Sequence, residues 1–440
     1  MTRSVSEILD DWKANDIAWV RFELPDLHGT ARVKLVPLAA AYHYAEEGLN
    51  MYGGAQVLDS RSDVVPGSGY NDEYAYADQM LRPDPATAQT IPWQPGHARF
   101  ICSAYSVDGT PRVASPRQLL SKVLETASEM GFGIKTGMEY ENYFLNPDGT
   151  PLFGGYHIFN PVRNVFHPVV LDLLEMLPKV GVDLITANAE YGPGQFELNF
   201  GPGDGLEGPD KSYTYKNAVK EVAHKHGLIG TFMSKPINGL AGCGAHLHLS
   251  LLDGKGTSVM GADKEEWGLS DTAKAFVAGN LKYARDIYTL LVPTVNCAKR
   301  RRPHTFAPSN ISWGHEDRSA LIRIKGMTEG SRHVEQRAAS GMSNPYLVTA
   351  GVLAAGLLGI REGLELEPPS GPGPAEDDPR YAPLPWTVHE ALDAFEASEP
   401  IRGMLGDEFC NIWSAVRRYE LRRFEDHVTD WERTEYLEIY

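Results

Sequence analysis

This sequence of 440 residues contains few cysteines and fewer basic than acidic residues. The four cysteines lie far apart and form no CxxC pair, which argues against a cysteine-based zinc or redox site. Lysine and arginine number 41 against 58 aspartates and glutamates, which gives a net charge of −17. A protein this acidic lacks the basic surface that non-specific nucleic-acid binding needs, and it is repelled by anionic lipid. We therefore expect neither nucleic acid nor a membrane among its partners.

Long hydrophobic runs are missing as well. The first residues, MTRSVSEILDDWK, contain no apolar stretch of the signal-peptide type. The longest apolar run, YLVTAGVLAAGLLGI at 346–360, is shorter than the roughly 20 residues that span a bilayer. We expect this run to be a buried helix and the protein to be cytoplasmic.

The length of the chain favours two domains of unequal size. The smaller comes first. A short amphipathic pattern predicts a helix, and β-branched and aromatic runs on either side of a turn predict a hairpin and a further strand. A region rich in Gly, Pro, Asp and Tyr has little periodicity and is expected to be irregular. These segments are the helix 4–14, the hairpin strands 18–24 and 31–37, the irregular region 53–96 and the strand 98–107.

The larger domain begins with a helix, because Ser115-Pro116 is typical of a helix start and Gly131 of its end. Strands and helices then alternate to about residue 362, which is typical of an α/β-type domain. An exposed Pro/Gly/acidic loop is expected at 367–379, and residues 386–438 are predicted to be helical.

Acidic side chains gather on two predicted strands. In GMEYENYF, Glu139 and Glu141 share one face because successive side chains of a strand alternate. Glu190 precedes the alternating strand QFELNF across a Tyr-Gly-Pro-Gly turn, and that strand carries Glu197. Carboxylates this close repel one another unless a cation lies beside them. A solvated sheet edge and a set of ligands for a hard metal ion are therefore the two interpretations.

Histidines follow on a third predicted strand, AHLHLS. His246, His248 and Ser250 lie on one face of it and leucines on the other. Structural histidines and metal-binding or substrate-binding histidines are about equally consistent with this pattern.

Arginines are concentrated between residues 299 and 337. The basic run KRRR starts at Lys299, and Arg318, Arg323 and Arg337 follow, with Arg323 among the apolar residues of ALIRI. A solvated basic loop is one interpretation, and a site for phosphate or carboxylate groups is the other. Metal-binding acids beside arginines suit phosphoryl transfer, although the chain has no GxxxxGK[ST] P-loop and no kinase HRD or DFG motif.

These stretches, in this order, resemble the glutamine synthetase family over nearly the whole chain. GMEYENYF is similar to the family's glutamate pair, AEYGPGQFE to its E-x-A-P-G-Q-x-E turn, and KPINGLAGCGAHLHLS to its K-P…G-x-G-x-H-x-H-x-S signature. VNCAKR, DRSALIRI and VEQR…NPYL resemble the segments that bind glutamate and ATP.

The resemblance implies an α+β fold of two parts. Residues 1–107 would form a β-grasp domain, and residues 108–440 a catalytic domain whose antiparallel strands surround a funnel-shaped site. It also implies a homo-oligomer, a hexameric ring usually stacked as a dodecamer, with active sites between neighbouring subunits. The irregular region 53–96 of one subunit would complete the site of the next.

The resemblance further implies ATP as a substrate and two or more Mg²⁺ or Mn²⁺ ions in each site. One ion would be held by Glu141, Glu190 and Glu197. The other, nearer the phosphates, would be held by Glu139, His246 and Glu335. The residues expected at the nucleotide are His248, Ser250, Arg318 and Arg323, and the two arginines would also stabilise the transferred phosphoryl group.

The acid substrate implied is L-glutamate. Arg300 and Arg337 would hold its carboxylates, with Gly242 in the adjoining backbone loop. Asp59, Ser62 and Tyr156 match the ammonium pocket of the family, where Asp59 would orient the amine and accept its proton.

The sequence departs from the family beside Arg300. Phe306 stands where ammonia-using members carry a flap glutamate, which closes the site and takes a proton from ammonium. A phenyl ring can do neither, but it stabilises a hydrocarbon group by roughly 25 cal/mol for each Å² removed from water. The alternative is an aromatic residue that only packs the flap.

The sequence therefore predicts an ATP-dependent ligase that joins the γ-carboxylate of L-glutamate to an organic amine through γ-glutamyl phosphate, so that this chain resembles the γ-glutamylamide ligase branches more than the ammonia-using enzymes. The first alternative is glutamine synthetase with ammonia as acceptor. A catalytically silent structural or sensing member ranks lower, because all six expected metal ligands are present.

Overall fold

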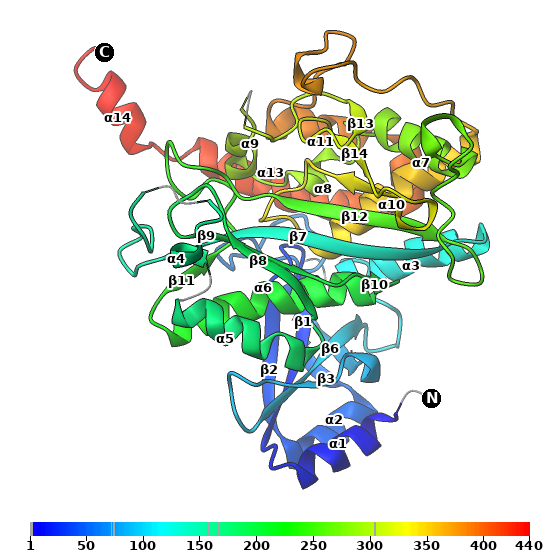
Figure 1. Ribbon diagram of the computed structural model, residues 1–440. Coiled ribbons are helices and arrows are strands. Elements are labelled where there is room, and N and C mark those ends of the chain that lie inside the picture. Colours follow the sequence, from blue (N-terminus) through cyan, green and yellow to red (C-terminus); the bar gives the residue numbers. More distant parts are fainter. Residues whose placement is uncertain (1–2, 72, 74, 156–157, 165–166, 303–304) are drawn as a thin grey trace.

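The computed structural model describes residues 3–440 except 72, 74, 156–157, 165–166 and 303–304. Two sheets organise the chain (Figure 1). The first has the strand order β2-β1-β6-β4-β3, with β5 paired to β6. Its strands are β1 (Trp19–Pro25), β2 (Ala31–Pro37), β3 (Leu49–Tyr52), β4 (Asp78–Pro83), β5 (Gln89–Thr90) and β6 (His97–Tyr105).

The first sheet forms its own core with two helices, α1 (Val5–Ala14) and α2 (Leu38–Glu47). Ser4 caps α1 in a reciprocal capping box with Glu7, and the apolar face of the helix buries Trp12 against Phe100 of β6. The predicted helix, hairpin and last strand are all confirmed. The region 53–96 was expected to be irregular, yet it contains β4 and β5. Their own sequences show no strand pattern, and pairing with β6 makes them strands.

The second sheet has the strand order β13-β14-β15-β12-β7-β9-β8, and β10 and β11 also pair with β7. The central pair is β7 (Gly133–Leu145) and β12 (Ala245–Leu252). The other strands are β8 (Leu184–Ala189), β9 (Gln195–Phe200), β10 (Gly203–Asp204), β11 (Ile229–Thr231), β13 (Trp313–His315), β14 (Ile322–Lys325) and β15 (His333–Gln336).

Neighbouring strands of this second sheet run antiparallel except β13 and β14. The alternation of strands and helices had suggested an α/β-type domain, and that interpretation is wrong. The α+β class is confirmed. The predicted domain limit at residue 107 stays a prediction, although the chain leaves the first sheet at Tyr105 and enters α3 (Pro116–Glu129).

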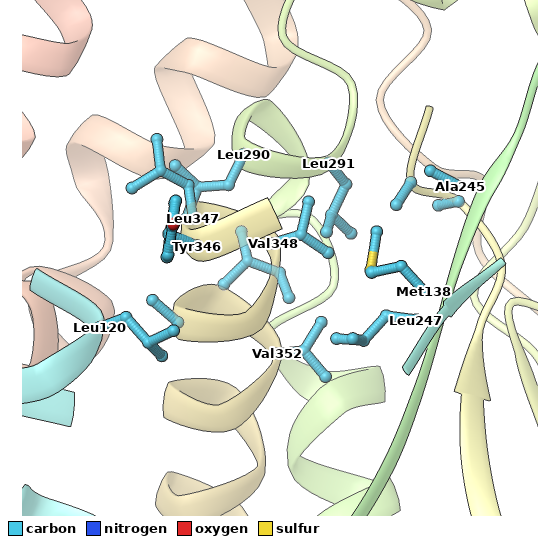
Figure 2. Close-up of a cluster of buried hydrophobic side chains, with 14 of the residues drawn as sticks. Leu120, Met138, Ala245, Leu247, Leu290, Leu291, Tyr346, Leu347, Val348 and Val352 are labelled. Atoms are coloured by element: carbon cyan, nitrogen blue, oxygen red, sulfur yellow. The ribbon is translucent and has the colours of Figure 1, made fainter. Parts of the chain in front are cut away.

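Helices pack on the second sheet and bury its apolar face. Figure 2 shows Met138 of β7 and Leu247 of β12 pointing toward Val348 and Val352 of α10 (Pro345–Glu362). The run 346–360 is therefore a buried helix, as predicted. The remaining helices are α4 (Pro161–Asn164), α5 (Pro168–Met176), α6 (Glu207–Lys225), α7 (Asp271–Lys282), α8 (Tyr288–Leu291), α9 (Val295–Arg300), α11 (Val388–Ala397), α12 (Glu399–Leu405), α13 (Asp407–Glu425) and α14 (Asp430–Tyr436).

Buried ion pairs join the two parts of the chain. Arg99 of β6 donates to Glu23 of β1 and to Thr214 of α6. Arg117 of α3 bridges Asp84 and Asp210. The first sheet is thereby fixed against α6, which lies beneath the second sheet. Among the helices of the described residues, none has both the length and the apolar character to cross a bilayer.

Candidate active site

Strand register brings the predicted site residues together on one face of the second sheet. Glu139 of β7 faces His246 of β12, and Glu141 of β7 faces Glu197 of β9. His248 of β12 faces Glu335 of β15, which in turn faces Arg323 of β14. Leu247 and Met138, at the intervening positions, are buried on the other face, as the alternation predicted.

Histidines and arginines surround the carboxylates on the β12–β15 side. His248 Nε2 lies 3.1 Å from Glu139 Oε2, and His246 Nδ1 lies 3.6 Å from Glu139 Oε1. Burial opposes ionisation of Glu139, but the two neighbouring histidines hold its pKa well below the ordinary value. Glu139 is therefore a carboxylate at neutral pH.

Glu335 is fully buried and is held by two arginines. Arg323 Nη1 donates to its Oε2 at 3.1 Å, and Arg337 Nη1 donates to its Oε1. Burial raises the pKa of Glu335, but the charges of His246 and Arg337 outweigh it and lower the pKa to about 2. Arg323 was expected at the nucleotide phosphates. In this structure its guanidinium pairs with Glu335 and with Glu316 of the preceding loop.

Carboxylates on the β7–β9 side have few positive neighbours. Asn188 donates to Glu190 and Asn199 donates to Glu197, but neither amide carries a charge. Burial and the neighbouring Glu141 raise the pKa of Glu190 to about 7. Burial and then the charges of Glu139 and Glu141 raise the pKa of Glu197 as well. This side of the site carries more negative charge than the protein neutralises.

The donor set fits divalent cations, which the resemblance implies. The buried His246 Nδ1 has no hydrogen-bond partner among the described residues, and it lies 3.5 Å from Glu335 Oε1 as well as near Glu139. Oxygen and imidazole donors suit Mg²⁺ or Mn²⁺. Nowhere in the described part of the chain do three His, Cys, Asp or Glu side chains already stand in metal-holding geometry. The ligand assignments therefore stay a prediction.

Arg300 extends from the end of α9 over the glycine loop that precedes β12. Its Nη2 lies 3.4 Å from His246 Nε2. A Cβ on Gly244 would meet Arg300 Nη2 at 2.5 Å, and one on Gly242 would meet Arg300 Cγ at 2.8 Å. The loop is thus shaped by glycine to admit this guanidinium. Burial lowers the pKa of Arg300, the charge of Glu141 opposes this shift, and the positive charge of Arg337 adds to it, so that Arg300 lies near both residues.

Arg337 connects this position to the loop that contains Phe306. Its Nε donates to the Arg318 carbonyl at 3.0 Å, and its Nη2 donates to the Phe306 carbonyl at 3.4 Å. Phe306 has a φ of 57°, and its side chain is 53% exposed. The backbone of Phe306 thus contacts Arg337, and its side chain is exposed rather than in the core. Arg318 contributes its backbone carbonyl here, and its side chain is exposed.

Other predicted site residues lie apart from this cluster in the single chain. Asp59 is fully buried against Arg423 of α13, and Ser62 Oγ accepts from Arg32 Nη1 at 3.1 Å. Ser250 lies on β12 opposite Lys135, at the far end from His246. Tyr156 falls outside the described residues. The region 53–96 was expected to serve a neighbouring subunit, and a single chain does not test that expectation.

His333 and Gln195 are neighbours of the site that the sequence analysis missed. His333 Nε2 lies 3.1 Å from His248 Nδ1, and its own Nδ1 contacts the Ser331 carbonyl. Gln195 Nε2 donates to the Gly242 carbonyl at 3.0 Å and so supports the glycine loop. Alternation on β15, which places His333 with Glu335, could have revealed the histidine.

Comparisons with known proteins agree with this geometry. The model of the glutamine synthetase catalytic domain matches residues 113–436. Glutamate–isopropylamine ligase from Pseudomonas sp. is 30% identical over 99% of this chain and 98% of its own length. Gamma-glutamylethanolamide synthetase from Streptomyces coelicolor is 33% identical over 95% of this chain and 92% of its own.

A further relative and a solved structure also match this chain. Glutamine synthetase from Halobacterium salinarum is 31% identical over all of this chain and 98% of its own length. The structure of GmaS in complex with ADP superposes with a TM-score of 0.88 at 28% identity and covers both chains completely. This chain therefore belongs to the glutamine synthetase family.

Proposed function

We propose that this protein is an ATP-dependent ligase that joins the γ-carboxylate of L-glutamate to an organic amine. The observation that carries the proposal is Phe306, an exposed phenyl ring at the position where ammonia-using relatives carry an acid, with its carbonyl bonded to Arg337. Relatives named for isopropylamine and ethanolamide products support it. A relative of similar identity is named glutamine synthetase, so ammonia is the competing acceptor.

The proposed reaction has two steps. Arg300 and Arg337 hold the carboxylates of glutamate. The free γ-carboxylate oxygen attacks the γ-phosphorus of ATP, the bond to the β–γ bridging oxygen breaks, and ADP leaves. The amine nitrogen then attacks the carbonyl carbon of γ-glutamyl phosphate, inorganic phosphate leaves, and the amine gives up a proton. The products are a γ-glutamylamide, ADP and phosphate.

Residues of this chain would bind the metal ions and the nucleotide in this scheme. Glu141, Glu190 and Glu197 on one side, and Glu139, His246 and Glu335 on the other, would hold Mg²⁺ or Mn²⁺, which neutralise phosphate charge when bound. His248, Ser250 and Arg318 would contact the nucleotide. Arg323 reaches it only if it exchanges Glu335 or Glu316 for a phosphate oxygen.

The amine pocket is proposed to include a second subunit. Asp59 and Ser62 lie away from the cluster of their own chain, so they serve a neighbour within a ring, hexameric or stacked as a dodecamer. Asp59 would then orient the amine and accept its proton, with Tyr156 in the same pocket. The aromatic ring of Phe306 would cover the hydrocarbon part of the amine.

The test is ATP-dependent phosphate release with L-glutamate, Mg²⁺ and a panel of acceptors, with mass detection of each product. The panel holds ammonium, methylamine, isopropylamine, ethanolamine, putrescine and aniline. We expect one organic amine to exceed ammonium by at least about tenfold in kcat/KM, which corresponds to about 1.4 kcal/mol of transition-state stabilisation. If ammonium is the best acceptor, the protein is a glutamine synthetase and the proposal for Phe306 is wrong.

A further inference from the structure

A cavity of about 810 Å³ adjoins the start of α9, the helix whose other end carries Arg300 of the candidate active site. None of the six predicted metal ligands lines it. Its walls come from the turn after β1 (Leu27, His28), α6, the start of α9 (Thr294, Asn296) and α13. The volume lies within the roughly 300–1,000 Å³ that is usual for small-molecule sites.

The lining of this cavity is strongly basic although the protein is acidic. Its charged lining residues are one acid, Glu420, and six cations: Arg32, Arg61, Lys216, Lys220, Arg417 and Arg423. Three of the cations have carboxylate partners, since Arg32 pairs with Asp26, Arg417 with Glu420 and Arg423 with Asp59. The remaining cations leave the cavity with an excess of positive charge.

Two lysines on α6 carry most of that excess. Lys216 and Lys220 are one helical turn apart, so both project from the same face of the helix. Lys216 Nζ donates to the Ser343 carbonyl at 3.0 Å and lies over the rings of Tyr140 and Phe232, and the negative charge of Asp26 acts on it only from beyond ion-pair distance. Among the described residues, Lys220 has neither a hydrogen bond nor an ion pair.

The two ammonium groups are unfavourable as they stand. Burial and then the charge of Lys220 lower the pKa of Lys216 to about 7. Burial also lowers the pKa of Lys220, and the negative charge of Asp26 opposes this shift without cancelling it. An anion between the two groups would remove their repulsion.

Apolar side chains complete the cavity beside the lysines. Phe232, Met342, Trp413 and Leu421 line it. A bare inorganic anion would leave this apolar wall uncovered, whereas a ring or alkyl group would bury it. The chemistry therefore favours an amphipathic ligand.

We propose that this cavity binds a small organic anion, with its carboxylate or phosphate between Lys216 and Lys220 and its apolar body against Phe232 and Trp413. The cavity contains none of the predicted metal ligands, although Ser62, which is proposed above for the amine pocket of a neighbouring subunit, is one of its lining residues. Binding of the anion does not require the reaction proposed above. The cavity adjoins the start of α9, the helix that ends at Arg300.

Calorimetric titration of the full-length protein with benzoate tests the proposal, and benzamide serves as the uncharged isostere. We expect one benzoate for each chain and binding of benzamide weaker by at least about tenfold. The binding should persist with saturating Mg·ADP and L-glutamate present. Lys220→Gln should weaken benzoate binding by about tenfold or more, and Lys225→Gln, an exposed lysine on the same helix and outside the cavity, should leave it unchanged.

Three outcomes would overturn the proposal. They are no benzoate binding at 10 mM or below (roughly the weakest binding expected for a charged pair in a recess), displacement of benzoate by ADP or L-glutamate, and equal binding to the Lys220→Gln variant. Light scattering adds a fourth. If Lys220→Gln changes the mass of the assembly, the cavity is filled by another copy of the chain. None of these outcomes bears on the amine panel, so the two proposals fail independently.

Discussion

The two halves of the carboxylate cluster differ in how their charge is balanced. On the β12–β15 half, Glu335 is held by two arginines and Glu139 by two histidines, and the pKa of each acid is lowered. On the β7–β9 half, Glu190 and Glu197 have amide partners, and their pKa values are raised. Chemically similar carboxylates of one site therefore have pKa values that are shifted in opposite directions.

This difference indicates which half is expected to need a bound cation. The β12–β15 half is neutralised by side chains of the same chain, so removing an acid there leaves buried positive charge. On the β7–β9 half, removing an acid or binding a cation reduces the repulsion among the buried carboxylates. Each prediction below tests this contrast.

Glu335→Gln should have the largest effect on stability. Removing the charge leaves the guanidinium groups of Arg323 and Arg337 buried without their partner, which costs about 3–5 kcal/mol. Urea denaturation in EDTA should show a lower free energy of unfolding. The matched change Glu197→Gln should preserve or raise it, and equal losses in both variants would contradict the contrast.

The pH dependence of the metal-free protein should reflect Glu190. Its folded pKa of about 7 is above the unfolded value of 4.5, so between these values the folded state holds a proton that the unfolded state has lost. Stability from this group is therefore present at low pH and is lost as pH rises from about 4.5 through 7, by about 1–3 kcal/mol. Thermal melts from pH 5 to 8 should show a smaller decline in Glu190→Gln, with exposed Glu129→Gln as the control.

Divalent cations should stabilise the protein through the β7–β9 half. After EDTA treatment, Mg²⁺ or Mn²⁺ at 100 times its Kd should raise the free energy of unfolding by about 2.7 kcal/mol. The shift in Tm should be mostly lost in Glu197→Gln and retained in Glu129→Gln. A full shift in Glu197→Gln would place the stabilising ion elsewhere.

Substitution of Phe306 should change the free energy of unfolding least. Its φ of 57° suits glycine, so Phe306→Gly should be more stable than Phe306→Ala by about 0.5–1 kcal/mol. Both variants lack the ring, so both should lose the preference for an organic amine equally. A preference that survives in either variant would separate the ring from acceptor choice.

The sequence predicted the positions that depend on local alternation. Glu139 with Glu141, and His246 with His248, follow from the two-residue period of a strand. The pairing of Arg323 with Glu335 did not follow, because it depends on the register of β14 against β15. Strand β4 was missed because its pairing with β3 and β6, not its composition, makes it a strand. The cavity at the start of α9 is built from eight separate stretches of the chain and leaves no local pattern in the sequence.

The contact between Asp59 and Arg423 has a practical consequence for engineering. Asp59 Oδ1 also accepts from the backbone N–H groups of Arg61 and Asp63, so one carboxylate shapes this loop while α13 holds it in place. The loop is therefore anchored by α13, and α14 projects from the body just beyond that anchor (Figure 1). An affinity tag or truncation is better placed next to α1, which lies far from this anchor (Figure 1).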